Sequence, residues 1–197
     1  PQKETIKADR DYVVVLSDFS DEKSDDIMGN LKMSSDYYAN ARRTVGDFFH
    51  DVKEQGFDKT WKTAKDWGQM RMMRTDLADV TGYTFLVNGK SPEQNWTGIF
   101  KPGEKVRLRF INASAMSFFD VRIPGLKMNV VQADGQNIEP VPVDEFRFAP
   151  AETYDVIVTP QDSKPYTIVA ESIDRSGFAI GTLATSEGQR GEIPKPR

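Results

Sequence analysis

The sequence predicts a mainly β-strand protein, folded as a β-sandwich or barrel, with a pair of α-helices inserted after the first strand. From Thr81 to Leu183, short apolar stretches alternate with Gly, Pro and Asn-Gly turns. That pattern is typical of sheets built from many short strands. Between about Ser34 and Met73, apolar residues recur instead at helical spacing.

Length and composition limit what the chain can be. Its 197 residues, 38% of them hydrophobic, suffice for one substantial domain with a packed core. The net charge of -4 argues against nucleic acid as a partner, because binding to phosphates needs concentrated basic surface. No apolar run approaches the ~20 residues that span a bilayer. Because the chain begins with Pro1 rather than Met, we expect it to be a piece of a longer protein.

The chain opens with a polar segment, residues 1–10, which we expect to be a linker. The run Tyr12–Leu16 is apolar and rich in β-branched residues, which indicates a buried strand. The acidic stretch Ser17–Asp26 then predicts a loop. We place the domain at residues 11–185 and treat 186–197 as a second linker, because Gly and Pro recur there.

The helical insertion is predicted over about residues 34–73. Ser34 begins a segment whose side chains can cap a helix, and Gly56 is a suitable end. Asp58 can cap a second helix that carries Trp61 and Trp67. The apolar residues of the first helix recur at 3.6-residue spacing, and they are Tyr38, Ala41, Val45, Phe48, Phe49 and Val52.

Strands fill the rest of the domain. In Lys105–Ile111 the alternation places Arg107 and Arg109 on a face wetter than the core face. The predicted strands are Tyr83–Val87, Lys105–Ile111, Phe118–Ile123, Met128–Ala133, Glu145–Phe148, Thr153–Thr159, Tyr166–Glu171 and Phe178–Leu183. The predicted core comprises Val13, Val15, Phe85, Val106, Leu108, Phe110, Val121, Val131, Val156, Val158 and Ile168.

The chain has no Cys and one His, and these counts exclude several kinds of site. Disulfides, thiolate nucleophiles, iron–sulfur clusters and Cys-based zinc sites lack their ligands. A blue-copper site needs one Cys and two His, so this chain cannot form one. His50 lies in a predicted helix, and a single imidazole does not make a metal site. We predict no catalytic residue and no cofactor in this chain, because none of its candidate side chains carries a specific signal.

A cluster of methionines is the one candidate metal site. Met70, Met72 and Met73 lie close together, and Met28 and Met33 belong to the preceding acidic segment. Thioethers select Cu(I) among metal ions. Methionines also fill irregular gaps beside helix ends, and we take that as the plainer explanation.

Other candidates carry little specificity. Trp61 and Trp67 can form a ligand platform, but at helical spacing they are more typical of packing. Arg107 and Arg109 suit a wet sheet face or a domain contact better than an anion site. Loop carboxylates usually face solvent, and a glycosidase would need two of them across a cleft. The acids concerned are Asp18, Asp21, Asp25, Asp26, Asp76 and Asp79.

A stronger signal is a series of segments in one order over about residues 83–159. They are Tyr83–Gly89, Lys101–Ser114, Phe119–Ile123, Val131–Gln136, Pro140–Asp144 and Ala151–Val158. Together they resemble the middle cupredoxin domain of three-domain multicopper oxidases, and Tyr12–Ser20 resembles its first strand. Many relatives have Gly and Arg where this chain has Ala151 and Thr153. Ala151–Asp155, Met70–Met73 and Asp76–Gly82 are most similar to the copper-resistance (CopA) type.

The resemblance implies a cupredoxin-like Greek-key β-sandwich with an inserted α-helical hairpin. The family's copper ligands belong to HxH and HCH motifs of the first and third domains, and this chain has neither motif. It therefore implies a copper-free structural middle domain, with flanking cupredoxin domains of the same chain as its partners. The parent would be a periplasmic oxidoreductase that holds copper, oxidises a substrate, with cuprous ion as a candidate, and reduces O2 to water.

Two alternatives stay open. The first is a methionine-rich module that handles Cu(I) through Met70, Met72 and Met73. The second is a free-standing β-sandwich that binds a carbohydrate or a protein through Trp61 and Trp67.

Overall fold

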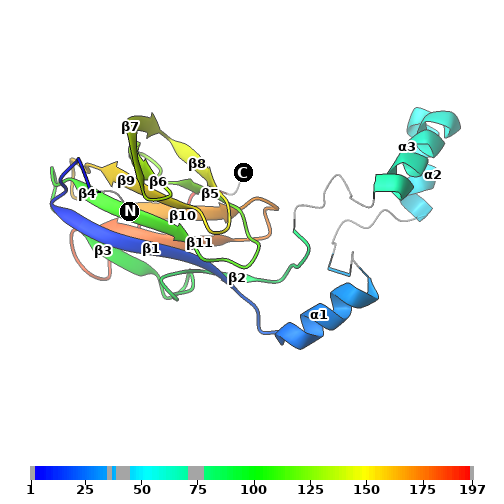
Figure 1. Cartoon of the computed structure of the whole chain (residues 1–197), viewed down its shortest axis with the longest axis horizontal. Helices are drawn as coiled ribbons and strands as arrows, with labels where there is room; N and C mark the ends of the chain where they lie inside the picture. The colour runs from blue at the N-terminus through cyan, green and yellow to red at the C-terminus, as the bar shows by residue number, and fades with distance from the viewer. Residues whose placement is uncertain (1–2, 35–36, 39–44, 71–77, 196–197) are drawn as a thin grey trace. The chain divides into compact units, whose positions relative to one another are not determined.

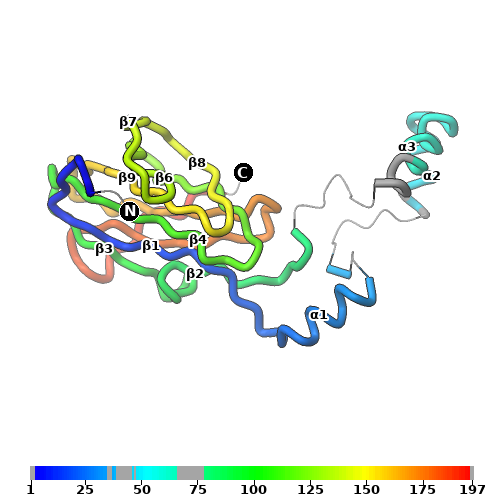
Figure 2. Tube along the Cα trace, viewed as in Figure 1, coloured from blue at the N-terminus to red at the C-terminus, as the bar shows by residue number. Residues whose placement is uncertain are grey.

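The computed structural model describes residues 3–34, 37–38, 45–70 and 78–195. Two compact units make up the chain (Figure 1). One unit combines Pro1–Asp21 with Gly82–Arg197 and holds the strands, and the other, Glu22–Thr81, holds the helices. The tube in Figure 2 follows the chain from the first strand into the helical unit and back to the remaining strands. The prediction of a mainly β protein with a helical insertion is confirmed.

The strands form two mixed sheets. The larger sheet has the order β2-β1-β4-β9-β6-β7, and the smaller one has the order β3-β11-β10-β5-β8. We call them sheet A and sheet B. Most neighbours are antiparallel, but β1 pairs with β4 and β3 with β11 in parallel. The strands of the two sheets are β1 Arg10–Phe19, β2 Thr84–Val87, β3 Trp96–Ile99, β4 Val106–Asn112, β5 Phe119–Arg122, β6 Met128–Ala133, β7 Gln136–Val143, β8 Glu145–Phe148, β9 Thr153–Val158, β10 Tyr166–Ser172 and β11 Phe178–Ala184.

The register between β1 and β4 decides which side of β1 is buried. Val14 lies opposite Phe110, and both side chains are fully buried. Neighbouring residues in register point to the same face of a sheet. The prediction of Val13 and Val15 as core residues is therefore wrong, and Val13 is 48% exposed. An unbroken apolar run such as Tyr12–Leu16 has no alternation from which its buried side can be deduced.

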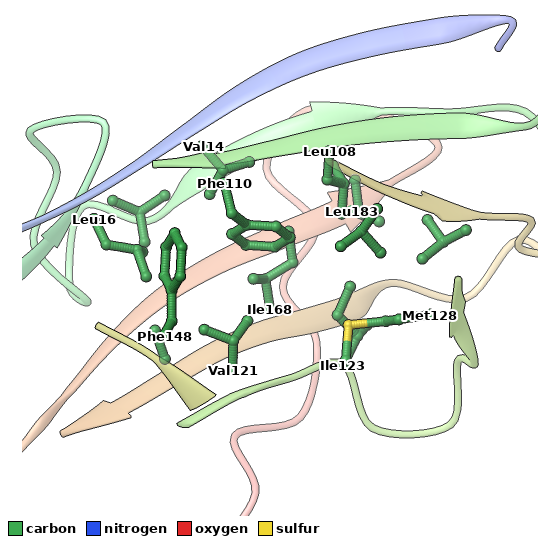
Figure 3. Close-up of a cluster of buried hydrophobic side chains, with 14 of the residues drawn as sticks. Val14, Leu16, Leu108, Phe110, Val121, Ile123, Met128, Phe148, Ile168 and Leu183 are labelled. Atoms are coloured by element: carbon green, nitrogen blue, oxygen red, sulfur yellow. The ribbon is translucent and has the colours of Figure 1, made fainter. Parts of the chain in front are cut away.

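The core lies between the two sheets. Figure 3 shows Val14 and Phe110 of sheet A among Val121 and Ile168 of sheet B. Side chains from the inner faces of two packed sheets interdigitate in this way in β-sandwiches. The other predicted core residues are all buried, and they are Phe85, Val106, Leu108, Phe110, Val121, Val131, Val156, Val158 and Ile168.

Two strands were not predicted. Strand β3 is only four residues long, and it contains Gly98, which is uncommon within strands. Strand β7 contains Pro140 and Pro142, and prolines in a strand are tolerated at a sheet edge. Both strands do lie at edges, β3 in sheet B and β7 in sheet A.

The described residues of the helical unit form three helices, α1 Ser24–Met33, α2 Val45–Gln55 and α3 Phe57–Met70. The prediction of an acidic loop over Ser17–Asp26 is wrong, because β1 continues to Phe19 and α1 begins at Ser24. Asp25 and Asp26 lie in the first turn of α1, where carboxylates interact favourably with the helix dipole. Gly56 ends α2 as predicted, with φ +85 in the left-handed region. No helix in the described part of the chain is long and apolar enough to cross a membrane.

Candidate functional site

The methionine cluster lies largely beyond what the structure describes. Met70 ends α3, but its side chain and the whole of Met72 and Met73 are outside the described residues. Met28 and Met33 lie on α1 and are 53% and 71% exposed. The role of the cluster in binding Cu(I) therefore stays a prediction.

His50 has the environment of an ordinary surface residue. It lies on α2, and its Nε2 is 3.6 Å from Oε1 of Glu54, one helical turn away. Both side chains are well exposed, and exposed pairs of this kind contribute little to stability. Within the part of the chain that the structure describes, no group of three or more His, Cys, Asp or Glu side chains is placed to hold a metal ion.

The acidic residues of the first strand and α1 serve the local fold. Asp18 accepts hydrogen bonds from the amide of Ala115 at 2.8 Å and from the hydroxyl of Ser117 at 2.8 Å. Asp18 therefore fixes the loop that follows β4. Asp21, Asp25 and Asp26 are exposed, whereas Asp76 lies outside the described residues.

Trp61, one of the two tryptophans of the predicted pair, belongs to an aromatic group. Trp61 on α3 stacks on Phe57, with ring centroids 6.0 Å apart and an interplanar angle of 10°. Phe48 on α2 contacts Phe49, Phe57 and Trp61 edge-on. The side chain of Trp67 lies outside the described residues. Trp61 is 57% exposed, so an exposed aromatic surface exists, and the pairing of Trp61 with Trp67 stays a prediction.

A buried ion pair lies on the outer face of sheet A. The prediction of a wet face is wrong for Arg107, which is 1% exposed. Its Nη1 donates to Oδ2 of Asp155 at 2.8 Å, and its Nη2 donates to the carbonyl of Ile6. Arg109 donates to the same Asp155 oxygen at 3.1 Å and also pairs with Asp11 and Glu4. The hydrogen bond to Asp11 is the main reason why the pKa of Arg109 is raised.

A second charged network lies on the outer face of sheet B. Asp120 accepts hydrogen bonds from Arg147 Nε at 2.9 Å and from Arg175 Nη2 at 2.8 Å. Arg122 donates to Glu171 at 2.8 Å, and its Nη1 is 3.7 Å from Oε2 of Glu145. Burial raises the pKa of Asp120, but the hydrogen bonds from the two arginines outweigh it and lower that pKa below its usual value.

This second network was missed, although the sequence carries its signal. Charged residues alternate with apolar ones in Phe119–Arg122 and again in Glu145–Phe148. Antiparallel pairing then places Asp120 opposite Arg147 and Arg122 opposite Glu145. Opposite charges in facing positions stabilise a strand pair, so the two patterns could have predicted the pairing of β5 with β8.

Both ends of the described chain contact the sandwich. Near the start, Asn137 donates to the carbonyl of Lys3, and Arg107 donates to that of Ile6. Near the end, Thr167 donates to the carbonyl of Glu192 and Arg122 to that of Lys195. The backbone close to each end is therefore held on the surface of the strand unit.

The residues of this chain do not fit a blue-copper site. The single imidazole is exposed on α2 and pairs with Glu54, and there is no cysteine in the sequence. Blue-copper sites take one thiolate and two imidazoles. No reaction step at a blue-copper centre can therefore be assigned to residues of this chain.

Comparison with known proteins agrees with this fold. The chain is 56% identical over 195 residues to copper resistance protein A of Escherichia coli, covering 98% of this chain and 32% of that protein. It is 55% identical to a copper resistance protein A homolog of Pseudomonas syringae pv. tomato, covering 98% of this chain and 33% of that protein. The chain thus spans about a third of the length of these relatives.

Solved structures share the fold at low sequence identity. Fet3p, a multicopper oxidase that functions in iron import, superposes with a TM-score of 0.63 at 16% identity, over 98% of this chain and 30% of that chain. The laccase of Botrytis aclada gives a TM-score of 0.58 at 20% identity, over 97% of this chain and 33% of that chain. Residues 10–188 match the family model for multicopper oxidases. With this match and with relatives that share more than half of its residues, the chain belongs to the multicopper oxidase family.

Proposed function

We propose that this chain is the copper-free structural middle domain of a periplasmic multicopper oxidase involved in copper resistance. The observation that carries the proposal is the likeness to copper resistance protein A, which covers nearly all of this chain but only 32% of that protein. About two thirds of such a polypeptide lies outside the chain, which leaves room for domains on either side. The shortage of imidazole and thiolate ligands supports a role without bound copper.

The parent protein would couple oxidation of a substrate to the reduction of O2 to water, with cuprous ion as the candidate substrate. The family's copper centres would then belong to the flanking domains. The task of this chain would be to hold those domains at fixed positions, because a site shared between domains works only when its supports are rigid. The two buried ion networks and the continuous core of the strand unit suit that task.

Copper loading of the isolated chain tests this role. The chain, incubated with Cu(II) and passed through a desalting column, should retain far less than one copper per molecule and show no blue-copper absorption band. The full-length parent is the positive control and should show the band under the same conditions. Stoichiometric blue copper in the isolated chain would contradict the proposal.

A further inference from the structure

Four aromatic side chains form one surface of the α2–α3 hairpin. Phe49, Phe57 and Trp61 are 67%, 57% and 57% exposed. Phe48 contacts all three, with ring centroids 6.0 to 6.5 Å away. We call these four residues the aromatic face. Contiguous exposed apolar surface of this kind marks interaction sites on soluble domains.

The helix side chains that the structure describes bury little apolar surface. Helices α1, α2 and α3 have 10, 11 and 14 residues. Isolated helices of such lengths are marginal in water, and packing of an apolar face is what normally stabilises them. Among the helix side chains that the structure describes, Thr60 alone is buried. The aromatic face is therefore the natural place for a stabilising contact.

The surroundings of the aromatic face indicate what kind of partner it fits. Lys53 follows Phe49 by four residues on α2, and Lys65 follows Trp61 by four residues on α3. Residues four apart in a helix are neighbours on its surface, and both lysines are exposed. Asp58 precedes Trp61 by three residues and is also exposed, so charges of both signs surround the rings. A matching surface would therefore have an apolar centre to receive the rings and a polar rim with charges of both signs.

The relatives indicate where that partner surface belongs. The match to copper resistance protein A covers 98% of this chain, so the helices lie within it, and about two thirds of that protein lies outside. A surface on the same polypeptide has a high effective concentration, so even a modest contact would form. A second copy of the chain has no such advantage.

We infer that the aromatic face docks onto an apolar surface with a polar rim, on another domain of the same polypeptide. This inference rests on the proposed function, because it requires the chain to be one domain of a longer protein. The inference gives the helical insertion a role in holding the neighbouring domain, beside the role already proposed for the two sheets.

Oxidation of tryptophan by N-bromosuccinimide tests the inference. The isolated chain and the full-length parent are treated side by side, and mass spectrometry follows the peptide that contains Trp61. Docking should slow oxidation of Trp61 in the parent by roughly tenfold or more, because a docked side chain reacts only during local opening. Trp96 is partly buried on β3 beside Tyr12, and it should react at the same rate in both proteins.

Two substitutions in the parent form a matched pair. Phe57→Asp places a charge in the aromatic face and should restore rapid oxidation of Trp61. Lys59→Asp adds an acid to the same exposed turn but lies off the aromatic face, and it should leave Trp61 protected. Slow oxidation of Trp96 in both variants verifies that the strand unit stays folded.

Equal reactivity of Trp61 in the isolated chain and in the parent would overturn the inference while leaving the proposed function intact. Protection that grows with the concentration of the isolated chain would also overturn it, in favour of a second copy. If no longer protein contains the chain, the proposed function itself fails, which the mass of the native protein decides separately.

Discussion

The hydroxyl group of Tyr12 makes two hydrogen bonds to a single residue, Ile99. It donates to the carbonyl oxygen of Ile99 at 2.7 Å and accepts from the amide of Ile99 at 3.0 Å. Tyr12 lies on β1 of sheet A, and Ile99 ends β3, an edge strand of sheet B. One phenol therefore ties the edge of one sheet to the other sheet.

Removing this hydroxyl should destabilise the sandwich. Tyr12→Phe keeps the edge-on contact with Trp96 but leaves both backbone groups of Ile99 without that partner. We expect the free energy of unfolding to fall by about 1–2 kcal/mol, the usual cost of such a loss. Urea unfolding measures the change. Tyr37→Phe, on a tyrosine that is 42% exposed, is the matched control and should change it by less than about 0.5 kcal/mol. An equal effect of both substitutions would contradict the role of Tyr12.

Asp120 should make stability depend on pH in the acid range. Its side chain is buried, and hydrogen bonds from Arg147 and Arg175 lower its pKa in spite of that burial. A carboxyl whose pKa is lower in the folded state stabilises the protein above its unfolded pKa of about 3.9. That contribution is lost as the pH falls through the folded pKa.

Asp120→Asn should therefore lower the unfolding free energy near neutral pH by about 2 kcal/mol, the scale of hydrogen bonds to charged groups. It should also flatten the dependence of stability on pH below about pH 4. Urea unfolding at a series of pH values measures both effects. Asp144→Asn is the control, because Asp144 is 84% exposed and pairs with Lys127 at the surface. If the unaltered chain and Asp120→Asn lose stability with falling pH in parallel, this account is refuted.

Ala151 has φ +66, in the left-handed region that favours glycine. A side chain in that region costs roughly 1–2 kcal/mol. Ala151→Gly should relieve part of this strain and raise the unfolding free energy by about 0.5–1 kcal/mol, after the greater backbone entropy of glycine is offset. Ala149→Gly, two residues earlier and not at positive φ, should lower it by a similar amount. Thermal unfolding of both variants measures the contrast, and destabilisation by both would show that Ala151 is unstrained.

The methionine cluster can be separated from the structural role by Cu(I) binding. The triple Met→Leu variant should keep its fold, because leucine replaces methionine at similar volume. If Met70, Met72 and Met73 only fill gaps, this variant should bind Cu(I) as the unaltered chain does. Competition with a chromogenic Cu(I) chelator measures the affinity. A weakening of about tenfold or more, equal to 1.4 kcal/mol, would instead favour the Cu(I)-handling alternative.

Most of the sandwich could be predicted from sequence because its strands alternate clearly. Val106, Leu108 and Phe110 alternate with arginines, and all three are buried as expected. Strand β1 could be recognised, but its buried face could not be predicted. Val13 and Val14 are chemically identical, and only the pairing with β4 distinguishes them. Helix α1 was missed because its acidic first turn resembles a loop when the helix dipole is not considered.

The candidate site was harder to predict because its properties depend on contacts between distant residues. Arg107 alternates with core residues as an exposed residue would, yet it is buried by Asp155 and by the segment near Ile6. Asp155 and Ile6 are 48 and 101 residues from Arg107 in the sequence. That this chain cannot form a blue-copper site, by contrast, follows from counting Cys and His.

The mass of the native protein tests the central claim most directly. A host that carries the gene is fractionated into periplasm and cytoplasm, and both fractions are immunoblotted with antibody to this chain. The proposed function predicts a periplasmic band, and the length of the relatives, about three times that of the chain, predicts its mass at roughly three times 22.2 kDa. A single band near 22.2 kDa would contradict the account, because a chain that stands alone has no flanking domains to hold.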